Sequence, residues 1–569
     1  MVIFHVDSPA FAVIAAEWVI RVRRIRRGME MQIRQRKVWG GGKTDLLLSV
    51  LVVVQLVLVF FMQKPVVINM DGIFSYTLSN NPYDYLFIDA AYETFPENNG
   101  WIDAHILKEN YVVETYDRFQ YAAVYLHQRC DVHPPLYYFA VHTISSLFPG
   151  TYSNMYTLSV NLFALLLADM IFIRLFKLLY GSSGYGIVPI FFLMSMEAMR
   201  FLLTWARMYM LLFAFCAWYL YIHARLLRFQ FRRTDLLQIA TCIILGTLTH
   251  YYFYVYAGML TLLVIFNLMR RRQGRELLKY LYFGIIGILT SWILYPWVLF
   301  HIFLNEQNKH TNLEGWSLEK GKAYADFLKK ELFHDRIWGC LLFLVIWIAG
   351  AFLLKKAGEK EKGEADWKPF FRRITAGSGL AYSLIIYTLD GGVLYYFTAF
   401  YMAFIVWASM VILDLSVKIP VSRKKYVVRI GVALLGVWIV CSGTVTNRYL
   451  SNARRVAGNL YQGLPLTDAF WQIPEKYQNY NCLYIEEQQD GLFHNYFFLF
   501  GEYRQFKKIS LEEFTLHGIR REDLLGCEEG GDGIVVYAPK ACELDERDYR
   551  RIAGDNSYDV YEYIGGDFS

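Results

Sequence analysis

After its first long apolar run the chain reads MDGIFSY at residues 70–76, and the polar, aromatic segment that starts there closes on DVHPPLYY at residues 131–138. Asp71 stands near the beginning of this segment and Asp131 near its end. Both carboxylates therefore lie where an apolar stretch meets a polar one. We interpret the segment as a site at the surface of a lipid bilayer.

The composition predicts a membrane protein. The chain is 55% hydrophobic and 17% aromatic over 569 residues, with a mean hydropathy of +0.26, which excludes one soluble domain and a disordered chain. A membrane-spanning helix needs about 20 mostly apolar residues, so the fold class is mainly α and polytopic. We expect eleven spans, at residues 46–66, 155–173, 185–203, 207–224, 235–250, 252–269, 280–302, 337–354, 374–389, 393–415 and 427–445.

Basic residues predict the orientation in the membrane. They cluster in short segments between alternate spans, at residues 21–43, 174–177, 225–233, 270–279, 355–373 and 418–429. Cytoplasmic loops are enriched in Lys and Arg, so the net charge of +6 indicates topology and not nucleic-acid binding. The N-terminal segment 1–44 is then cytoplasmic, the transmembrane domain covers 45–446 with a first loop at 69–150, and that loop and the C-terminal domain 447–569 are extracytoplasmic.

Two shorter segments bear on this topology. The apolar run 136–148 has only about 13 residues, fewer than a span needs, and follows two prolines, so we expect it to be re-entrant or interfacial. The first residues place acids ahead of an arginine cluster, the reverse of a signal peptide, and Met29 or Met31 is an alternative start.

The C-terminal region changes character, because charged residues and short alternating apolar segments replace the long runs. The pattern predicts a small α/β domain. We expect strands at Cys482–Glu486, Gly533–Tyr537 and Tyr558–Ile564, and helices at Gly491–Phe500 and Leu511–Phe514. The cysteines on this side are Cys130, Cys482, Cys527 and Cys542, and the sequence leaves a disulfide among them open.

The candidate catalytic residue is Asp71. It follows the first span at the level of the lipid head groups, where a partly dehydrated carboxylate can serve as a base, although a helix N-cap is an equally good interpretation. The prolines after His133 fix the directions of Asp131 and His133. For His133 taken alone, a structural interfacial histidine is the simpler interpretation, and Tyr137 and Tyr138 fit an ordinary aromatic belt.

Charged residues near the ends of predicted spans are further candidates. Arg207, near Tyr209, has no obvious partner in the local sequence and could bind a lipid phosphate, or it could extend to the head groups. Arg200 is expected to pair with Glu197.

Two tight outer turns bring titratable groups to the same predicted surface. One holds His250 and Tyr251, and the other holds Asp390. Turn chemistry alone explains each of them.

Together these residues resemble the GT-C glycosyltransferases, which include family 39-like proteins, protein O-mannosyltransferases and the lipid A aminoarabinose transferase. The resemblance rests on Asp71 after the first span, the His-Pro-Pro-Leu-Tyr-Tyr stretch at 133–138, and the Arg-x-Tyr pair at Arg207 and Tyr209, and it covers residues 45–270. Gly72 and Trp205 stand where many members carry further acids, which leaves any role of a second acid open.

The resemblance implies a sugar transfer, with inversion, from a polyprenyl-phosphate donor to an acceptor hydroxyl on the outer face of a bacterial plasma membrane. Asp71 would be the base, Arg207 would neutralise the phosphate, and Asp131 with His133 would position sugar or acceptor. No cofactor beyond the lipid-linked sugar is expected, no metal cage is visible, and a need for a divalent metal stays open. The acceptor could be an envelope polymer, a glycolipid or a protein.

Two other functions stay open. A transporter or flippase for a lipid-linked glycan also needs many spans, but would place substrate-binding charges deep in several helices and often shows repeats. A non-catalytic scaffold for envelope assembly would use the C-terminal domain for binding. Replacement of Asp71 by asparagine distinguishes these functions, because only an enzyme loses transfer while it stays folded.

Overall fold

The structure is a computed structural model that describes residues 43–63, 70–82, 100–229, 231–303, 317–333, 367–417, 473–487, 498–519, 532–542, 544–554 and 558–565. The chain forms two compact units, Met1–Val54 and Gln55–Ser569. The described part of the first unit is the beginning of helix α2 (Lys43–Gln63). All other described elements belong to the second unit.

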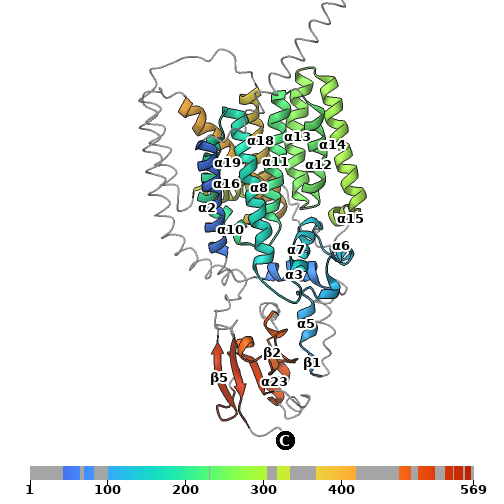
Figure 1. The fold of residues 1–569 in the computed structure, drawn as a ribbon, viewed down its shortest axis with the longest axis vertical. Coiled ribbons are helices and arrows are strands. Elements are labelled where there is room, and N and C mark those ends of the chain that lie inside the picture. The colour runs from blue at the N-terminus through green and yellow to red at the C-terminus, as the bar shows by residue number, and fades with distance from the viewer. Residues whose placement is uncertain are drawn as a thin grey trace, which may run out of the picture. The chain divides into compact units, whose positions relative to one another are not determined.

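In the described part of the second unit, the longest helices lie side by side (Figure 1). Helix α8 packs on α11, α12 packs on α14, and α18 packs on both α13 and α19. Their bounds are α8 (Met155–Tyr180), α9 (Ile187–Ser195), α10 (Glu197–Thr204), α11 (Tyr209–Phe229), α12 (Arg233–Thr247), α13 (Tyr252–Arg270), α14 (Gly274–Leu294), α15 (Trp297–Phe303), α16 (Leu318–Phe333), α18 (Trp367–Asp390), η5 (Leu394–Phe397) and α19 (Thr398–Val417).

Four helical segments among the described residues are long and apolar enough to cross a membrane: Tyr209–Phe229, Tyr252–Arg270, Gly274–Leu294 and Leu394–Asp414. The pair Ser183–Met194 and Ala198–Thr204, bent by 81°, would make a fifth.

These segments agree with the predicted polytopic class, but the predicted number of eleven spans is not confirmed. Two of the predicted spans, 337–354 and 427–445, lie outside the described residues. Another, 235–250, corresponds to α12, which has 15 residues, whereas a straight span needs about 20.

Five helices precede α8 in the described part of the first loop: α3 (Met70–Asn80), α5 (His105–Glu109), η2 (Thr115–Asp117), α6 (Tyr121–Cys130) and α7 (Leu136–Leu147). Helix α7 is the apolar run predicted to be re-entrant or interfacial. It begins directly after Pro135 and has 12 residues, too few for a span. Helix α3 packs against α6 and α7, so the beginning and the end of the segment 70–138 lie together.

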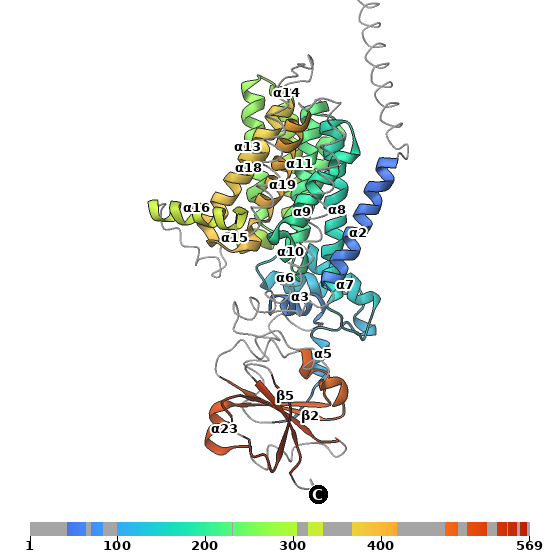
Figure 2. The same ribbon diagram turned by 90° about the vertical axis from the view of Figure 1, so that its left-hand side faces the viewer.

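A six-stranded sheet follows, with strand order β1-β3-β2-β4-β6-β5. Its strands are β1 (Ile102–Asp103), β2 (Asn481–Glu486), β3 (Gln505–Ser510), β4 (Ile534–Pro539), β5 (Tyr549–Gly554) and β6 (Tyr558–Tyr563). β2 is parallel to both β3 and β4, while β1 pairs antiparallel with β3. The first loop therefore contributes a strand to the sheet of the C-terminal region. Figure 2 shows this sheet with helix α23 (Leu511–His517) beside it.

Three of these strands, β2, β4 and β6, form where the sequence predicts them, because each alternates side chains between two apolar layers. In β2, Cys482 and Tyr484 join the large core, and Leu483 and Ile485 join a second, smaller core. The predicted helix at 511–514 is part of α23, which Ser510 caps by accepting from the backbone N–H of Glu513.

Other predictions for this region meet the limits of the described residues. Most of the predicted helix 491–500 and the predicted domain boundary near 447 lie outside them. The thiols of Cys130, Cys482 and Cys542 are free, and Cys527 is outside the described part.

Candidate active site

Asp71 lies in the first turn of α3, where its carboxylate faces the connection between α10 and α11. A second contact fixes the helix in this place, because the Ser75 hydroxyl donates to the carbonyl oxygen of Ala206 at 2.7 Å. Ser75 is one helical turn after Asp71 and therefore on the same face of α3. The helix thus presents an acid and a hydroxyl to the backbone around Arg207.

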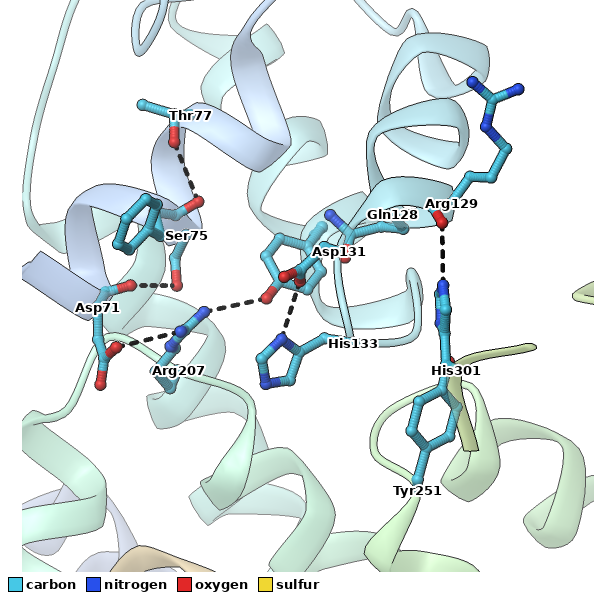
Figure 3. A network of polar contacts seen from close by, with 12 residues as sticks. Asp71, Ser75, Thr77, Gln128, Arg129, Asp131, His133, Arg207, Tyr251 and His301 are labelled. Atoms are coloured by element: carbon cyan, nitrogen blue, oxygen red, sulfur yellow. Dashed lines mark hydrogen bonds and ion pairs between the residues drawn. The ribbon is translucent and has the colours of Figure 1, made fainter. Parts of the chain in front are cut away.

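Arg207 is the partner of Asp71. Its Nη2 donates to Asp71 Oδ1 at 3.2 Å (Figure 3). Its Nη1 donates to the hydroxyl of Tyr138 at 3.1 Å. The Arg207 side chain is 10% exposed and that of Asp71 is 24% exposed. The sequence analysis found no obvious partner for Arg207 in the local sequence, and α3 and α7 supply these two partners from far along the chain.

Asp131 and His133 form a second pair, just before α7. Asp131 is the C-cap of α6, and its Oδ2 lies 2.8 Å from Nδ1 of His133. Burial alone would raise the pKa of Asp131, but the charge and hydrogen bond of His133, helped by the charge of Arg207, lower it below the ordinary value. The carboxylate therefore stays ionised and orients the imidazole.

His250 lies on the other side of His133, with ring centroids 5.9 Å apart. Burial and the charges of His133 and Arg207 lower the pKa of His250 well below its ordinary value, so this ring is neutral near pH 7. Its Nδ1 accepts the backbone N–H of Tyr252 at 3.1 Å. The ring of Tyr209 packs on His250 at 5.4 Å, which connects the Arg-x-Tyr pair with the His-Pro-Pro stretch.

Tyr251 reaches the same region through another histidine. Its hydroxyl lies 2.7 Å from Nδ1 of His301, and Nε2 of His301 lies 2.9 Å from the backbone oxygen of Arg129 (Figure 3). This chain of contacts holds the turn after α12 against the end of α6. Tyr251 is thereby placed near the Asp131 turn.

All seven predicted site residues, Asp71, Asp131, His133, Arg207, Tyr209, His250 and Tyr251, belong to this connected region. The predicted Glu197–Arg200 pair and the Asp390 turn stay untested, because the side chains of Glu197 and Asp390 are outside the described part.

Three further residues belong to the site: Tyr138, which the sequence analysis assigned to an aromatic belt, and Ser75 and His301, which it did not select. Tyr138 fits an interfacial belt, yet it is fully buried and its hydroxyl contacts Arg207. Its place one turn beyond the two prolines was a usable signal. Ser75 and His301 carry no such signal, since hydroxyls and histidines near helix ends are common.

The arrangement combines one buried cation, two carboxylates and three imidazoles. Arg207 offers a guanidinium that can bind a phosphate oxyanion. A carboxylate next to it can accept a proton, and the aspartate-oriented imidazole can hydrogen-bond a hydroxyl. Among the described residues, no group of three or more His, Cys, Asp or Glu side chains lies close enough to hold a metal ion.

Comparison with known proteins gives a similarity in overall structure. No protein-family model matches the chain, and no curated protein matches it either. The chain is similar to the crystal structure of ArnT from Cupriavidus metallidurans bound to undecaprenyl phosphate, at 13% identity and a TM-score of 0.49, over 92% of this chain and 98% of that one. The same protein in the apo state gives 14% identity and a TM-score of 0.47, over 90% and 97%.

Proposed function

We propose that the protein is a glycosyltransferase that moves a sugar from a polyprenyl-phosphate donor to an acceptor hydroxyl at the outer face of a membrane. The observation that carries this proposal is the contact of Arg207 with both Asp71 and Tyr138 at the start of α11, a helix apolar enough to span. A lipid-borne phosphate reaches a protein at the level where such helices begin. The motifs that resemble GT-C enzymes supply the same three positions.

Arg207 is the proposed phosphate ligand. When the donor binds, its phosphate competes with Asp71 for the guanidinium, because both are oxyanions that accept from the same N–H groups. Tyr138 keeps Nη1 oriented during this exchange. Asp71 is then freed from its ion pair while it still lies beside the reacting phosphate.

Asp71 is the proposed base. It takes the proton of the acceptor hydroxyl while the acceptor oxygen forms a bond to the anomeric carbon. The bond between that carbon and the phosphate oxygen breaks, and its electron pair leaves with the carrier phosphate, whose charge Arg207 balances. Attack opposite the phosphate inverts the anomeric centre, and a phosphate leaving group needs no separate acid.

The remaining polar residues of the site are proposed to bind sugar or acceptor. His133, held by Asp131, and the neutral His250 offer directional hydrogen bonds, while Tyr209 and Tyr251 add aromatic faces with polar edges. A panel of donors identifies the sugar, and envelope extracts supply the candidate acceptors.

The test is transfer of radiolabelled sugar from a panel of polyprenyl-phosphate sugars to envelope extracts by the purified full chain. Asp71→Asn should abolish transfer. Asp117→Asn is the matched control, because Asp117 is a buried acid of the same loop that contacts Gln120 instead of Arg207. Transfer by Asp71→Asn would disprove the base assignment. Absence of transfer by folded wild type with every donor would favour the transporter or scaffold.

A further inference from the structure

Helix α3 is held at both ends by different parts of the protein. Its beginning is fastened to the Arg207 connection through Asp71 and Ser75. Its last residue, Asn80, donates through Nδ2 to the carbonyl oxygen of Tyr111 at 2.8 Å and to the Ser145 hydroxyl at 3.0 Å. A helix of 11 residues with glycine at its third position is marginal by itself. Its position therefore depends on these contacts.

Tyr76 is the contact on the back of this helix. It follows Asp71 by five residues, which turns it by roughly 140° from the Asp71 face at about 100° per residue. The side chain is fully buried, and its hydroxyl accepts from the backbone N–H of Thr157 at 3.2 Å and donates to the carbonyl oxygen of Ser153. A side chain that packs on Tyr76 therefore supports α3 from the side opposite the site.

Phe498 packs there, although it belongs to the C-terminal region. Its ring lies edge-to-face with Tyr76 at 5.9 Å, and it also contacts Tyr111 at 4.4 Å and Tyr152 at 4.6 Å. The ring is 3% exposed, and the Phe498 carbonyl oxygen accepts from the Tyr111 hydroxyl at 3.1 Å. One aromatic side chain of the C-terminal region is thus enclosed by three tyrosines, which come from α3, from the first loop and from the connection before α8.

The segment that follows Phe498 is fastened to the first loop at several points. Lys108 pairs with Glu502 at 2.9 Å, and the backbone N–H of Ala104 donates to the carbonyl oxygen of Arg504 at 3.2 Å. At Gly501 a Cβ atom would lie 2.7 Å from the Tyr111 hydroxyl and 2.9 Å from the Lys108 backbone nitrogen, so only glycine fits. Strand β1 adds the pairing with β3. Phe498 therefore has little freedom relative to the first loop.

We propose that Phe498 is a positioning residue for Asp71, through which the C-terminal region holds α3 so that the carboxylate stays in place beside Arg207. This inference rests on the proposed function, since it assigns the contact a consequence for transfer. A displacement of about 1 Å of a reacting group can cost roughly 100-fold in rate. Loss of the ring removes one wall behind Tyr76 and allows a shift of that size.

The first test compares kinetics of full-length variants with one donor that wild type uses. Phe498→Ala should lower kcat about 10- to 100-fold and leave the donor KM within about twofold, because Arg207 still binds phosphate. Phe498→Leu restores apolar volume and should recover kcat to within about threefold of wild type.

The control is Tyr484→Ala, which removes a buried ring of strand β2 that contacts Phe500 and Tyr558. This control should leave the kcat of the folded protein within about threefold. Equal losses in Phe498→Ala and Tyr484→Ala, or an effect of Phe498→Ala on KM alone, would overturn the proposal.

A second test needs no transferase activity. Cys130→Ser removes the one exposed thiol among the described cysteines. In this background Asp71→Cys introduces a cysteine, and its rate of maleimide modification is measured above the rate of the Cys130→Ser parent. Adding Phe498→Ala should raise this rate several-fold, whereas adding Tyr484→Ala should not. An unchanged modification rate would refute the proposal that Phe498 positions residue 71, even if the protein transfers sugar. A raised modification rate in a protein that transfers no sugar would support the positioning role of Phe498 and would reject the proposed function instead.

Discussion

The ion pair of Asp71 and Arg207 should show strong energetic coupling in a double-mutant cycle of Asp71→Asn, Arg207→Gln and both together. At the observed 3.2 Å, with an effective dielectric constant of about 20, the raw attraction is about 5 kcal/mol. Desolvation of the two groups offsets much of it. We expect a coupling free energy of about 1–3 kcal/mol, the range found for contacting charged residues.

The two single variants should differ in cost because the side chains differ in exposure. Asp71→Asn leaves a guanidinium that is 10% exposed with Tyr138 as its remaining partner, whereas Arg207→Gln leaves a carboxylate that is 24% exposed. The buried cation has less access to water. Asp71→Asn should therefore reduce the free energy of unfolding more than Arg207→Gln, and the double variant should recover part of that loss.

The assay is unfolding of the purified full chain by a denaturing detergent, followed by far-UV circular dichroism. The reference cycle uses Asp545 and Arg547, whose side chains pair on the surface with 43% and 87% exposure. That cycle should show no measurable coupling. A coupling free energy at Asp71 and Arg207 no larger than at the reference pair would show that their contact does not stabilise the protein. It would refute the proposal that the donor phosphate displaces a stabilising ion pair.

Three further predictions use other parts of the structure. Tyr138→Phe removes the hydroxyl 3.1 Å from Arg207 Nη1, so it should lower kcat/KM for the donor roughly 5- to 30-fold, for a loss of about 1–2 kcal/mol, and an unchanged value would contradict the role of that hydrogen bond. Burial lowers the pKa of His142 to about 4, so the unfolded chain takes up a proton first as pH falls below about 6.5. The unfolding temperature of wild type should then drop more between pH 7 and pH 5 than that of His142→Gln, and parallel drops would contradict this. At Gly287 a Cβ atom would lie 3.0 Å from the Ala240 backbone, while nothing lies within 4 Å at Gly284. Gly287→Val should reduce stability by about 1–3 kcal/mol and Gly284→Val should not, as unfolding in detergent would show.

Much of the membrane part could be predicted because hydropathy is a local signal. The positions of α8, α11, α13 and α19 follow directly from apolar runs, and α7 is recognised as too short by its length alone. The number of spans is harder, because a buried helix of a large bundle and a spanning helix have similar composition. Helix α12, with 15 residues between a charged start and a tight turn, is predicted to be a span by its hydropathy and falls short by its length.

Two strands of the sheet, β3 and β5, were not predicted from the sequence, because their charged residues interrupt the apolar pattern and pair with residues of neighbouring strands. β3 reads QFKKIS, and its two lysines hide the alternation, yet Lys507 is 3% exposed and Lys508 pairs with Glu486 at 2.8 Å. β5 is an edge strand that carries Arg550 and Arg551, and both pair with acids of β6. No local pattern can reveal partners that are supplied by another strand.

The candidate site illustrates the same limit more sharply. Asp71, His133 and Arg207 could each be selected because charges at the ends of apolar runs are costly unless they are used. Their mutual contacts could not be predicted, because the partner of Arg207 lies on α3 and Phe498, behind that helix, comes from the opposite end of the sequence. A short helix between an ion pair on one face and an aromatic ring on the other can translate a shift of the C-terminal region into a shift of the carboxylate. In this arrangement, contacts between the C-terminal region and the first loop help to position Asp71. The geometry of Asp71 therefore depends on residues outside the local sequence MDGIFSY.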